Sequence, residues 1–230
     1  MKYDNLIQID DATYRYEDNG VRFFILIGSK RALLIDSGMN VKNIKDVVLS
    51  VTNKPFTLIN THADPDHIGA NNEFSSFMMH PSESSNYYND STRVGTIIPV
   101  YDKSVIDLGD RELEVILIPG HTPGSIALLD KKNRVLYSGD SIQDDKIFLF
   151  GPMREINAYI SSLERLNSIK SRFDTIYPSH GTPELNPSFI DILLSGVRKV
   201  KNKEINYKQI NLFGKTLSLY DIGCAKVLTN

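Results

Sequence analysis

Apolar and polar residues along the chain form two blocks, and each block begins with strands and continues into a helix. In the first block, residues 13–16 and 21–23 partly alternate between apolar and polar, and short apolar runs follow at residues 24–27 and 32–35. These patterns predict antiparallel strands, the last of which ends at the sequence Asp-Ser-Gly, residues 36–38. Apolar residues at helical spacing between Val41 and Val51 predict a helix. A further strand at residues 56–59 leads directly into Thr61 and His62.

The second block repeats this order after a polar stretch. Strands are predicted at residues 114–118, 126–129 and 135–137. A helix follows them, and after it a short strand at residues 175–177. A later helix is expected to have Asn186 as its cap and Pro187 at its first position. The tail beyond residue 205 has strand-like pieces around Gly214 and Gly223. Strands followed by helices, occurring twice, predict an α/β fold in which two sheets face each other with helices outside, in a single domain spanning 1–230.

The segment 71–100 is the least regular part of the chain, with Pro81, Gly95, Pro99 and many serines and asparagines. Segments of that length without clear periodicity in compact domains are usually functional or disordered, so this one is expected to overhang the site. Three tyrosines lie in it or beside it: Tyr87, Tyr88 and Tyr101. They are candidates for contacting a substrate, although most such residues only anchor a loop.

The composition argues for a small-molecule substrate. The 230 residues are 41% hydrophobic, and 26 basic against 28 acidic side chains give a formal net charge of −2. This balance predicts no binding to nucleic acid or to a membrane surface. The single cysteine, Cys224, allows no internal disulfide, and the N-terminus has no basic segment followed by an apolar one, so a cytoplasmic location is expected. No apolar run approaches the roughly 20 residues of a membrane span, so a soluble protein is expected.

Histidines carry the strongest chemical signal. Four of the five in the chain directly follow predicted strands, beside glycine, proline or aspartate: His62, His67, His121 and His180. The densest segment places four ligand types within six positions, His62, Asp64, Asp66 and His67. In an extended loop, residues 62, 64 and 66 project to one side and residue 67 to the other, so one segment can supply two neighbouring metal ions. Asp66 also supplies a carboxylate that can accept a proton from a coordinated water.

Three further segments complete the pattern: residues 119–125 around His121, residues 138–140 ending in Asp140, and residues 177–181 around His180. Taken together, residues 36–181 resemble the metallo-β-lactamase-fold metallo-hydrolase superfamily, with glyoxalase II-like and lactonase-like members as the nearest types. The resemblance implies a four-layer αβ/βα sandwich with a dinuclear metal site at its edge. It also implies a metal-bridging hydroxide as nucleophile, and usually zinc, although iron and manganese members exist. Asp36 matches the family's early strand-end aspartate, which usually supports the ligands.

Carried over by position, His62, Asp64 and His121 would hold one ion, Asp66, His67 and His180 the other, and Asp140 would bridge them. Asp64 departs from the family's commoner motif H-x-H-x-D-H, because this chain has H-x-D-x-D-H. Its carboxylate lowers the formal charge of the metal core from about +1 to about zero and adds an oxygen ligand, which favours iron or manganese over zinc.

Other chemically capable residues are expected to be structural. His80 lacks a ligand context and is interpreted as a loop or strand-end residue. Ser125 and Ser138 flank ligands without a histidine left to activate them. Arg93 and Arg154 are candidates for gripping a substrate carboxylate, but exposed arginine is the default. Cys224 is expected to be buried.

The leading functional hypothesis is metal-dependent hydrolysis of an ester-like bond, a thioester or a lactone, in a small molecule. The chain lacks the long helical extension of typical glyoxalase II enzymes, and has Asp140 where the commonest zinc β-lactamases have cysteine. Alternatives are a phosphodiesterase acting on a small phosphodiester, a di-iron redox protein resembling the metal domain of flavodiiron proteins, and a non-catalytic metal-bound sensor. The oligomeric state and natural substrate are not predicted.

Overall fold

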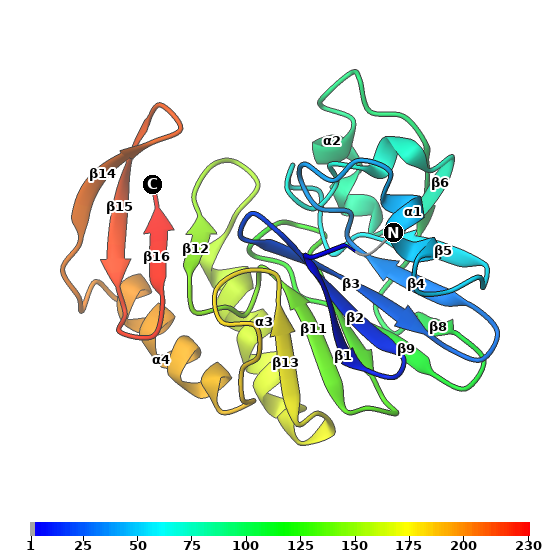
Figure 1. The fold of residues 1–230 in the computed structure, drawn as a ribbon. Coiled ribbons are helices and arrows are strands. Elements are labelled where there is room, and N and C mark those ends of the chain that lie inside the picture. Colours follow the sequence, from blue (N-terminus) through cyan, green and yellow to red (C-terminus); the bar gives the residue numbers. More distant parts are fainter. Residues whose placement is uncertain (1–2) are drawn as a thin grey trace. The chain divides into compact units, whose positions relative to one another are not determined.

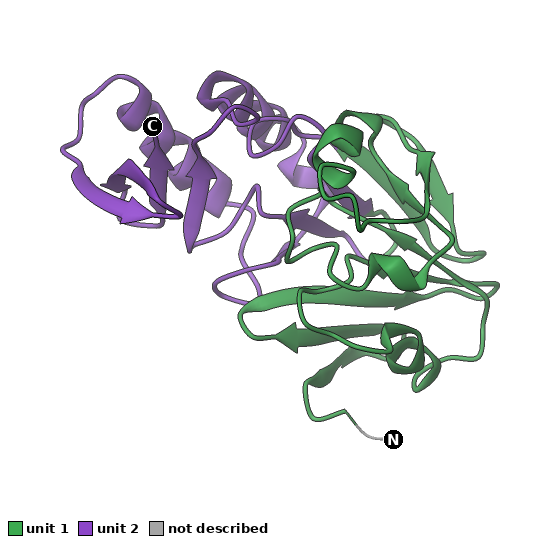
Figure 2. Cartoon of the chain, turned by 90° about the horizontal axis from the view of Figure 1, so that it is seen from above, with its two compact units in different colours: residues 1–116, 130–132 green, residues 117–129, 133–230 purple. Residues whose placement is uncertain are grey.

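The computed structural model describes residues 3–230, and the chain divides into two compact units (Figure 2). Unit 1 comprises residues 1–116 and 130–132, and unit 2 comprises residues 117–129 and 133–230. The single-domain organisation stays a prediction. Both units combine strands with helices (Figure 1), as the predicted α/β class requires.

Unit 1 is built on a seven-stranded sheet whose strands follow the order of the sequence, β1 to β7. The first four strands pair antiparallel, and β4 to β7 pair parallel. The strands are β1 (Leu6–Asp10), β2 (Thr13–Asp18), β3 (Val21–Ile27), β4 (Ala32–Ile35), β5 (Phe56–Ile59), β6 (Ser76–Met79) and β7 (Thr96–Pro99). A shorter antiparallel pair consists of β8 (Val105–Asp107) and β9 (Glu112–Leu117).

One face of this sheet packs against helix α1 (Ile44–Leu49). Alternate residues of the central strands, among them Phe23, Ile25 and Leu34, lie in one buried cluster with Ile44 and Val47 of the helix. The helix is shorter than its apolar spacing predicted. Asn43 precedes it with a φ of 57°, a left-handed conformation that a continuing helix cannot adopt, and Ser50 ends it. Val41 and Val51 still pack against the core, but from the segments on either side of the helix.

The prediction of an irregular segment at residues 71–100 is wrong in part. Strands β6 and β7 lie within it and extend the parallel side of the sheet. The segment also holds two 3-10 turns and one short helix: η1 (Asn71–Glu73), η2 (Pro81–Glu83) and α2 (Ser84–Tyr87). Because each element has only three or four residues, none is long enough to show a helical or alternating period in the sequence.

Unit 2 contains two parallel-strand pairs and two longer helices. β11 (Val135–Gly139) pairs with β13 (Thr175–Pro178), and β10 (Ile126–Asp130) precedes them in the chain. A four-stranded sheet has the order β12-β16-β15-β14, with β12 and β16 parallel. Its strands are β12 (Lys146–Leu149), β14 (Lys208–Leu212), β15 (Lys215–Asp221) and β16 (Lys226–Thr229). The helical elements are α3 (Ile156–Ser168), the turn η3 (Lys170–Arg172) and α4 (Phe189–Lys201), and α3 contacts α4.

The predicted start of α4 needs a correction of two residues. Its N-cap is Ser188, whose side chain makes no capping hydrogen bond. Asn186 instead accepts a hydrogen bond from the backbone N–H of Ser188 at 2.9 Å, which forms a turn before the helix. The predicted strand pieces of the tail are confirmed, because turns at Gly214 and Gly223 connect β14, β15 and β16.

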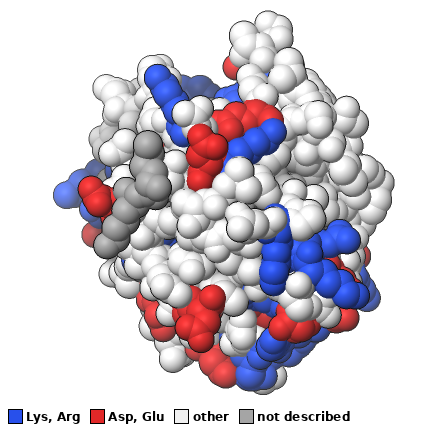
Figure 3. Space-filling model, turned by 45° about the vertical axis from the view of Figure 1, so that its right-hand side comes forward, with Lys and Arg blue, Asp and Glu red and all other residues white. Residues whose placement is uncertain are grey.

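Among residues 3–230, no helix combines the length and the apolar character needed to cross a bilayer. On the face drawn in Figure 3, basic and acidic side chains are interspersed. This matches the near-neutral charge of the sequence.

Candidate metal centre

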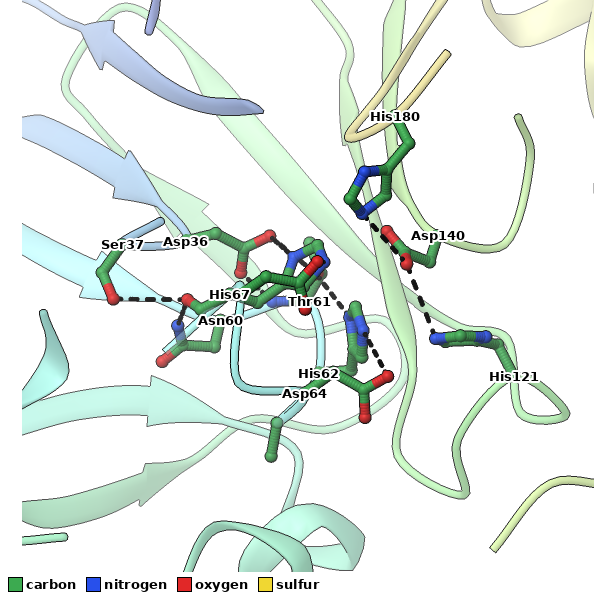
Figure 4. A network of polar contacts seen from close by, with 12 residues as sticks. Asp36, Ser37, Asn60, Thr61, His62, Asp64, His67, His121, Asp140 and His180 are labelled. Carbon is green, nitrogen blue, oxygen red and sulfur yellow. Dashed lines mark hydrogen bonds and ion pairs between the residues drawn. The ribbon is translucent and has the colours of Figure 1, made fainter. Parts of the chain in front are cut away.

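In unit 1, the predicted ligands lie on the loop that follows β5. The N–H of His67 donates to the carbonyl oxygen of Asp64 at 2.9 Å, which closes the loop into a turn. His62 and His67 are buried, and their ring centroids are 4.0 Å apart. Nε2 of His62 lies 3.6 Å from Oδ2 of Asp64, and Nε2 of His67 lies 3.7 Å from Oδ2 of Asp66. Each histidine therefore presents the same ring nitrogen to a carboxylate (Figure 4).

Asp36 makes the hydrogen bonds that orient these histidines. Its carboxylate is 1% exposed and accepts the Thr61 N–H at 2.7 Å and the Thr61 hydroxyl at 2.8 Å. Oδ2 also lies 2.8 Å from Nδ1 of His67. An ionised carboxylate has no hydrogen to give, so Nδ1 of His67 is the donor. In the neutral ring this leaves the lone pair on Nε2, as a metal ligand requires.

The Thr61 hydroxyl fixes the tautomer of His62 in the same way. Its hydroxyl hydrogen goes to Asp36, so its oxygen acts as the acceptor for Nδ1 of His62, 3.0 Å away. His62 therefore also keeps its lone pair on Nε2. One buried carboxylate thus sets the tautomers of two histidines. The supporting role predicted for Asp36 agrees with these contacts.

Amide and hydroxyl side chains hold the end of the same loop. The carbonyl oxygen of His67 accepts the Ser37 N–H and Asn60 Nδ2, each at 2.9 Å. Asn71 Nδ2 donates to Asn60 Oδ1 at 2.8 Å, and the Ser37 hydroxyl donates to Asn71 Oδ1 at 2.7 Å. Sequence reasoning missed these three residues. Ser37 and Asn60 stand at strand ends like the ligands themselves, which is the one signal that pointed to them.

Unit 2 supplies the other predicted ligands. β11 and β13 are parallel neighbours, with Gly139 in register with Pro178, so the residues just beyond them, Asp140 and His180, meet at one sheet edge. Nε2 of His180 lies 3.4 Å from Oδ2 of Asp140, and Nε2 of His121 lies 3.7 Å from the same oxygen. Nδ1 of His121 donates to the carbonyl oxygen of Phe148 at 3.1 Å. His121 therefore has the same tautomer as His62 and His67.

These separations fit a shared cation. Zinc binds nitrogen and oxygen at about 2.1 Å in tetrahedral geometry, which places two ligand atoms about 3.4 Å apart. The four histidine-carboxylate distances are 3.4 to 3.7 Å, longer than good hydrogen bonds and close to this edge length. Neutral imidazoles facing carboxylates through Nε2 are a suitable donor set for a divalent metal ion.

Helix α3 supports the ligand loops of unit 2. The Tyr159 hydroxyl donates to the carbonyl oxygen of Ser141 at 2.6 Å, beside Asp140. Complete burial raises the pKa of Tyr159, so this hydroxyl stays a donor. The N–H of Glu155 donates to the carbonyl oxygen of Gly120 at 2.9 Å, next to His121. Gly120 has a φ of 133°, and a Cβ there would collide with the Tyr159 backbone, which explains glycine at this position.

The remaining sequence candidates have structural contacts. His80 follows β6, and its Nδ1 accepts the Ser82 N–H at 3.3 Å, which confirms the strand-end interpretation. Ser125 contacts Thr122 and Ser138 donates to Ile142, both inside unit 2. The prediction that Cys224 is buried is wrong, because it is half-buried beside the turn before β16.

The segment 71–100 braces the ligand loop of unit 1. The guanidinium of Arg93 donates to the carbonyl oxygen of Ile68 at 2.6 Å, and Glu83 accepts the Ala63 N–H at 2.9 Å. The Tyr87 and Tyr88 hydroxyls donate to carbonyl oxygens at residues 94 and 95, and Tyr101 is exposed beside the His80 ring. Arg93 and the first two tyrosines therefore anchor loops, whereas Arg154 lies over the Phe150 ring.

Comparisons with known proteins agree with this geometry. A family model described as the metallo-beta-lactamase superfamily matches residues 18–77 and 75–180. Human acyl-coenzyme A thioesterase MBLAC2 is 26% identical, across 77% of this chain and 78% of that protein. A probable metallo-hydrolase of Methanocaldococcus jannaschii is 28% identical, across 73% of this chain and 89% of that protein. A solved metallo-beta-lactamase from Pontibacter korlensis has a TM-score of 0.70 at 17% identity, across 84% of this chain and 98% of that one. The predicted fold and resemblance are confirmed.

Proposed function

The chain belongs to the metallo-beta-lactamase superfamily and is a hydrolase, and we propose that it uses two divalent metal ions to cleave thioesters of the acyl-coenzyme A class. The observation that carries the proposal is the common tautomer of His62, His67 and His121, each with Nδ1 bound and Nε2 directed at a carboxylate. The name of the human relative supports the choice of thioester over lactone.

We assign His62, Asp64 and His121 to one ion, Asp66, His67 and His180 to the other, and Asp140 to both. Within each unit the pairs that this assignment needs are present: His62 with Asp64 and His67 with Asp66 in unit 1, and Asp140 with His121 and His180 in unit 2. The assignment of Asp64 depends on its contact with His62 at 3.6 Å. Zinc is the usual metal by family, and the added carboxylate favours iron or manganese.

When bound, the two ions would supply an activated water as nucleophile and polarise the carbonyl oxygen of the thioester. The chain's own residues supply the rest. Asp66, with its side chain 29% exposed, accepts the proton released as water attacks the carbonyl carbon and passes it to solvent. The carbon-sulfur bond then breaks and the thiolate leaves. Asp36 and Thr61 keep the histidine rings in position.

The functional test is a substrate panel. Protein loaded separately with zinc, manganese and iron is offered an acyl-coenzyme A thioester, a lactone, a β-lactam and a small phosphodiester. We expect the thioester to have the highest kcat/KM, at least about tenfold above the others, because a binding site fitted to one leaving group discriminates by that order. Turnover of the phosphodiester alone would refute thioester hydrolysis.

The metal preference is tested by Asp64→His, which restores the commoner motif. The substitution replaces an oxygen ligand with a nitrogen ligand and removes one negative charge. We therefore expect the ratio of zinc to manganese affinity to rise about tenfold, measured by competition with a chromogenic chelator. Asp64→Asn separates the effect of charge from that of donor type. An unchanged ratio in Asp64→His would show that residue 64 does not contact the metal.

A further inference from the structure

An aromatic cluster in unit 2 is hydrogen-bonded to a predicted metal ligand, His121. The carbonyl oxygen of Phe148, on β12, accepts the hydrogen bond from Nδ1 of His121. The Phe148 ring lies 5.5 Å from the Phe150 ring and 6.3 Å from the Phe213 ring, centroid to centroid, both edge to face. β12 and the β14–β15 hairpin that carries Phe213 belong to one sheet (Figure 1). Phe150 is buried in the core and supports the half-buried Phe148, whereas Phe213 is exposed. We name Phe148 and Phe213 the aromatic subsite.

Phe213 is placed where a bulky apolar residue is unfavourable. It forms a two-residue turn with Gly214, with φ values of 51° and 71°. Such turns favour asparagine followed by glycine, and a bulky side chain at positive φ is strained. Phe213 is also 73% exposed. Neither the turn nor the core of unit 2 requires an aromatic ring there, and strain of this kind points to a function at the site.

Two cationic side chains border the same rings. Nζ of Lys215 lies 6.0 Å from the centroid of the Phe150 ring, and Cζ of Arg154 lies 5.7 Å from it. Lys215 is exposed and follows the Phe213-Gly214 turn directly. A surface that combines the exposed ring of Phe213 with guanidinium and ammonium groups is complementary to a ligand with both planar or apolar groups and phosphates.

The hairpin lies outside the part of the chain that matches the family. The match ends at residue 180, whereas β14 and β15 span residues 208–221. The matched residues therefore include the proposed ligands and β12, whereas the hairpin is free to carry substrate specificity.

We propose that the aromatic subsite, with Lys215 and Arg154, binds the phosphate-bearing carrier arm of the thioester substrate; this inference rests on the proposed thioester hydrolysis. Phe213 packs on the arm from the hairpin tip, and the two cations pair with its phosphates. The thioester end of the same molecule then extends past Phe148 toward His121.

The test measures binding and turnover separately. Binding of S-methyl coenzyme A, which has no thioester to cleave, is measured by calorimetry on the metal-loaded protein, on Phe213→Ala and on Lys215→Gln. We expect each substitution to weaken binding about tenfold, as for loss of one stacking or charge-assisted contact. Tyr207→Ala, which removes another exposed aromatic ring of unit 2, and Lys203→Gln are the matched controls and should bind normally.

Turnover is compared on an acyl-coenzyme A and on the same acyl group carried by N-acetylcysteamine, which lacks the nucleotide and phosphates. Phe213→Ala and Lys215→Gln should raise KM for the first substrate about tenfold and leave the second unchanged. Equal binding of S-methyl coenzyme A by wild type and both variants would overturn the subsite while thioester hydrolysis could stand.

Two further outcomes are distinct. Loss of a dimer on light scattering in Phe213→Ala would show that a second copy covers the hairpin tip, which overturns the proposal. Absence of all thioester turnover, with binding of S-methyl coenzyme A still dependent on Phe213 and Lys215, would refute the proposed function and retain the subsite.

Discussion

Replacement of His121 by alanine is expected to lower kcat/KM for thioester hydrolysis about a thousand-fold, equivalent to about 4 kcal/mol of transition-state stabilisation. His121 is 1% exposed, and its Nδ1 bond to the Phe148 carbonyl directs Nε2 at Asp140. Alanine removes this nitrogen without altering the backbone of the loop. Bound metal, measured by elemental analysis after dialysis, should fall from two ions per chain toward one.

His80→Asn is the matched control for this substitution. His80 is also largely buried, at 9% exposure, but it is not among the proposed ligands. The amide oxygen of asparagine can accept the Ser82 N–H in place of Nδ1, so the turn at η2 is kept. Metal content and kcat/KM should match wild type. Full activity in His121→Ala would remove this residue from the metal site.

The fold was predictable where the pattern is long or chemically distinct. The buried strand β4 occupies the predicted residues, because four consecutive apolar residues end at Asp36 and a polar turn. The length of α1 was not predictable, because Val41 and Val51 continue the helical spacing while packing from turns. Strands β6 and β7 were missed because they are short and depend on pairing, β6 with β5 and β7 with β6, which leaves no local sequence signal.

The candidate site divides in the same way. The types and order of the candidate ligands could be predicted, since they stand at strand ends beside glycine or proline. The groups that orient them could not. The acceptor for Nδ1 of His121 is a backbone carbonyl 27 residues away, and the brace on Ser141 is a tyrosine hydroxyl from α3. A carbonyl has no side-chain identity to detect, and Tyr159 is indistinguishable from an ordinary core residue of a helix.

Replacement of Asp36 by asparagine is expected to lower the affinity for the proposed metal ion held by His67 by about 10- to 100-fold, the usual cost of losing a group that orients a ligand. With its amide oxygen accepting the Thr61 N–H, the introduced side chain would direct an NH2 group at Nδ1 of His67. His67 would then carry its hydrogen on Nε2, where it cannot bind a metal ion. Asparagine suits the backbone, because residue 36 has a φ of 63°.

The measurement is a chelator competition for two metal equivalents, with a thermal melt to show that the variant folds. Asp18→Asn is the matched control: Asp18 is another buried carboxylate of unit 1, and its Oδ2 accepts the Met39 and Asn40 N–H groups at 2.7 and 2.8 Å. It contacts no predicted ligand in these bonds, so its substitution should lower the melting temperature without changing metal affinity.

Measuring the affinity of each metal equivalent also distinguishes the roles of His62 and His67, the two histidines linked to Asp36. If Asp36→Asn bound both equivalents as tightly as wild type, the tautomer of His67 would not depend on Asp36, and the coupling of two histidines through one carboxylate would be wrong. Loss of one equivalent alone would show that only His67 depends on Asp36, whereas loss of both would show that the Thr61 hydroxyl transmits the change to His62.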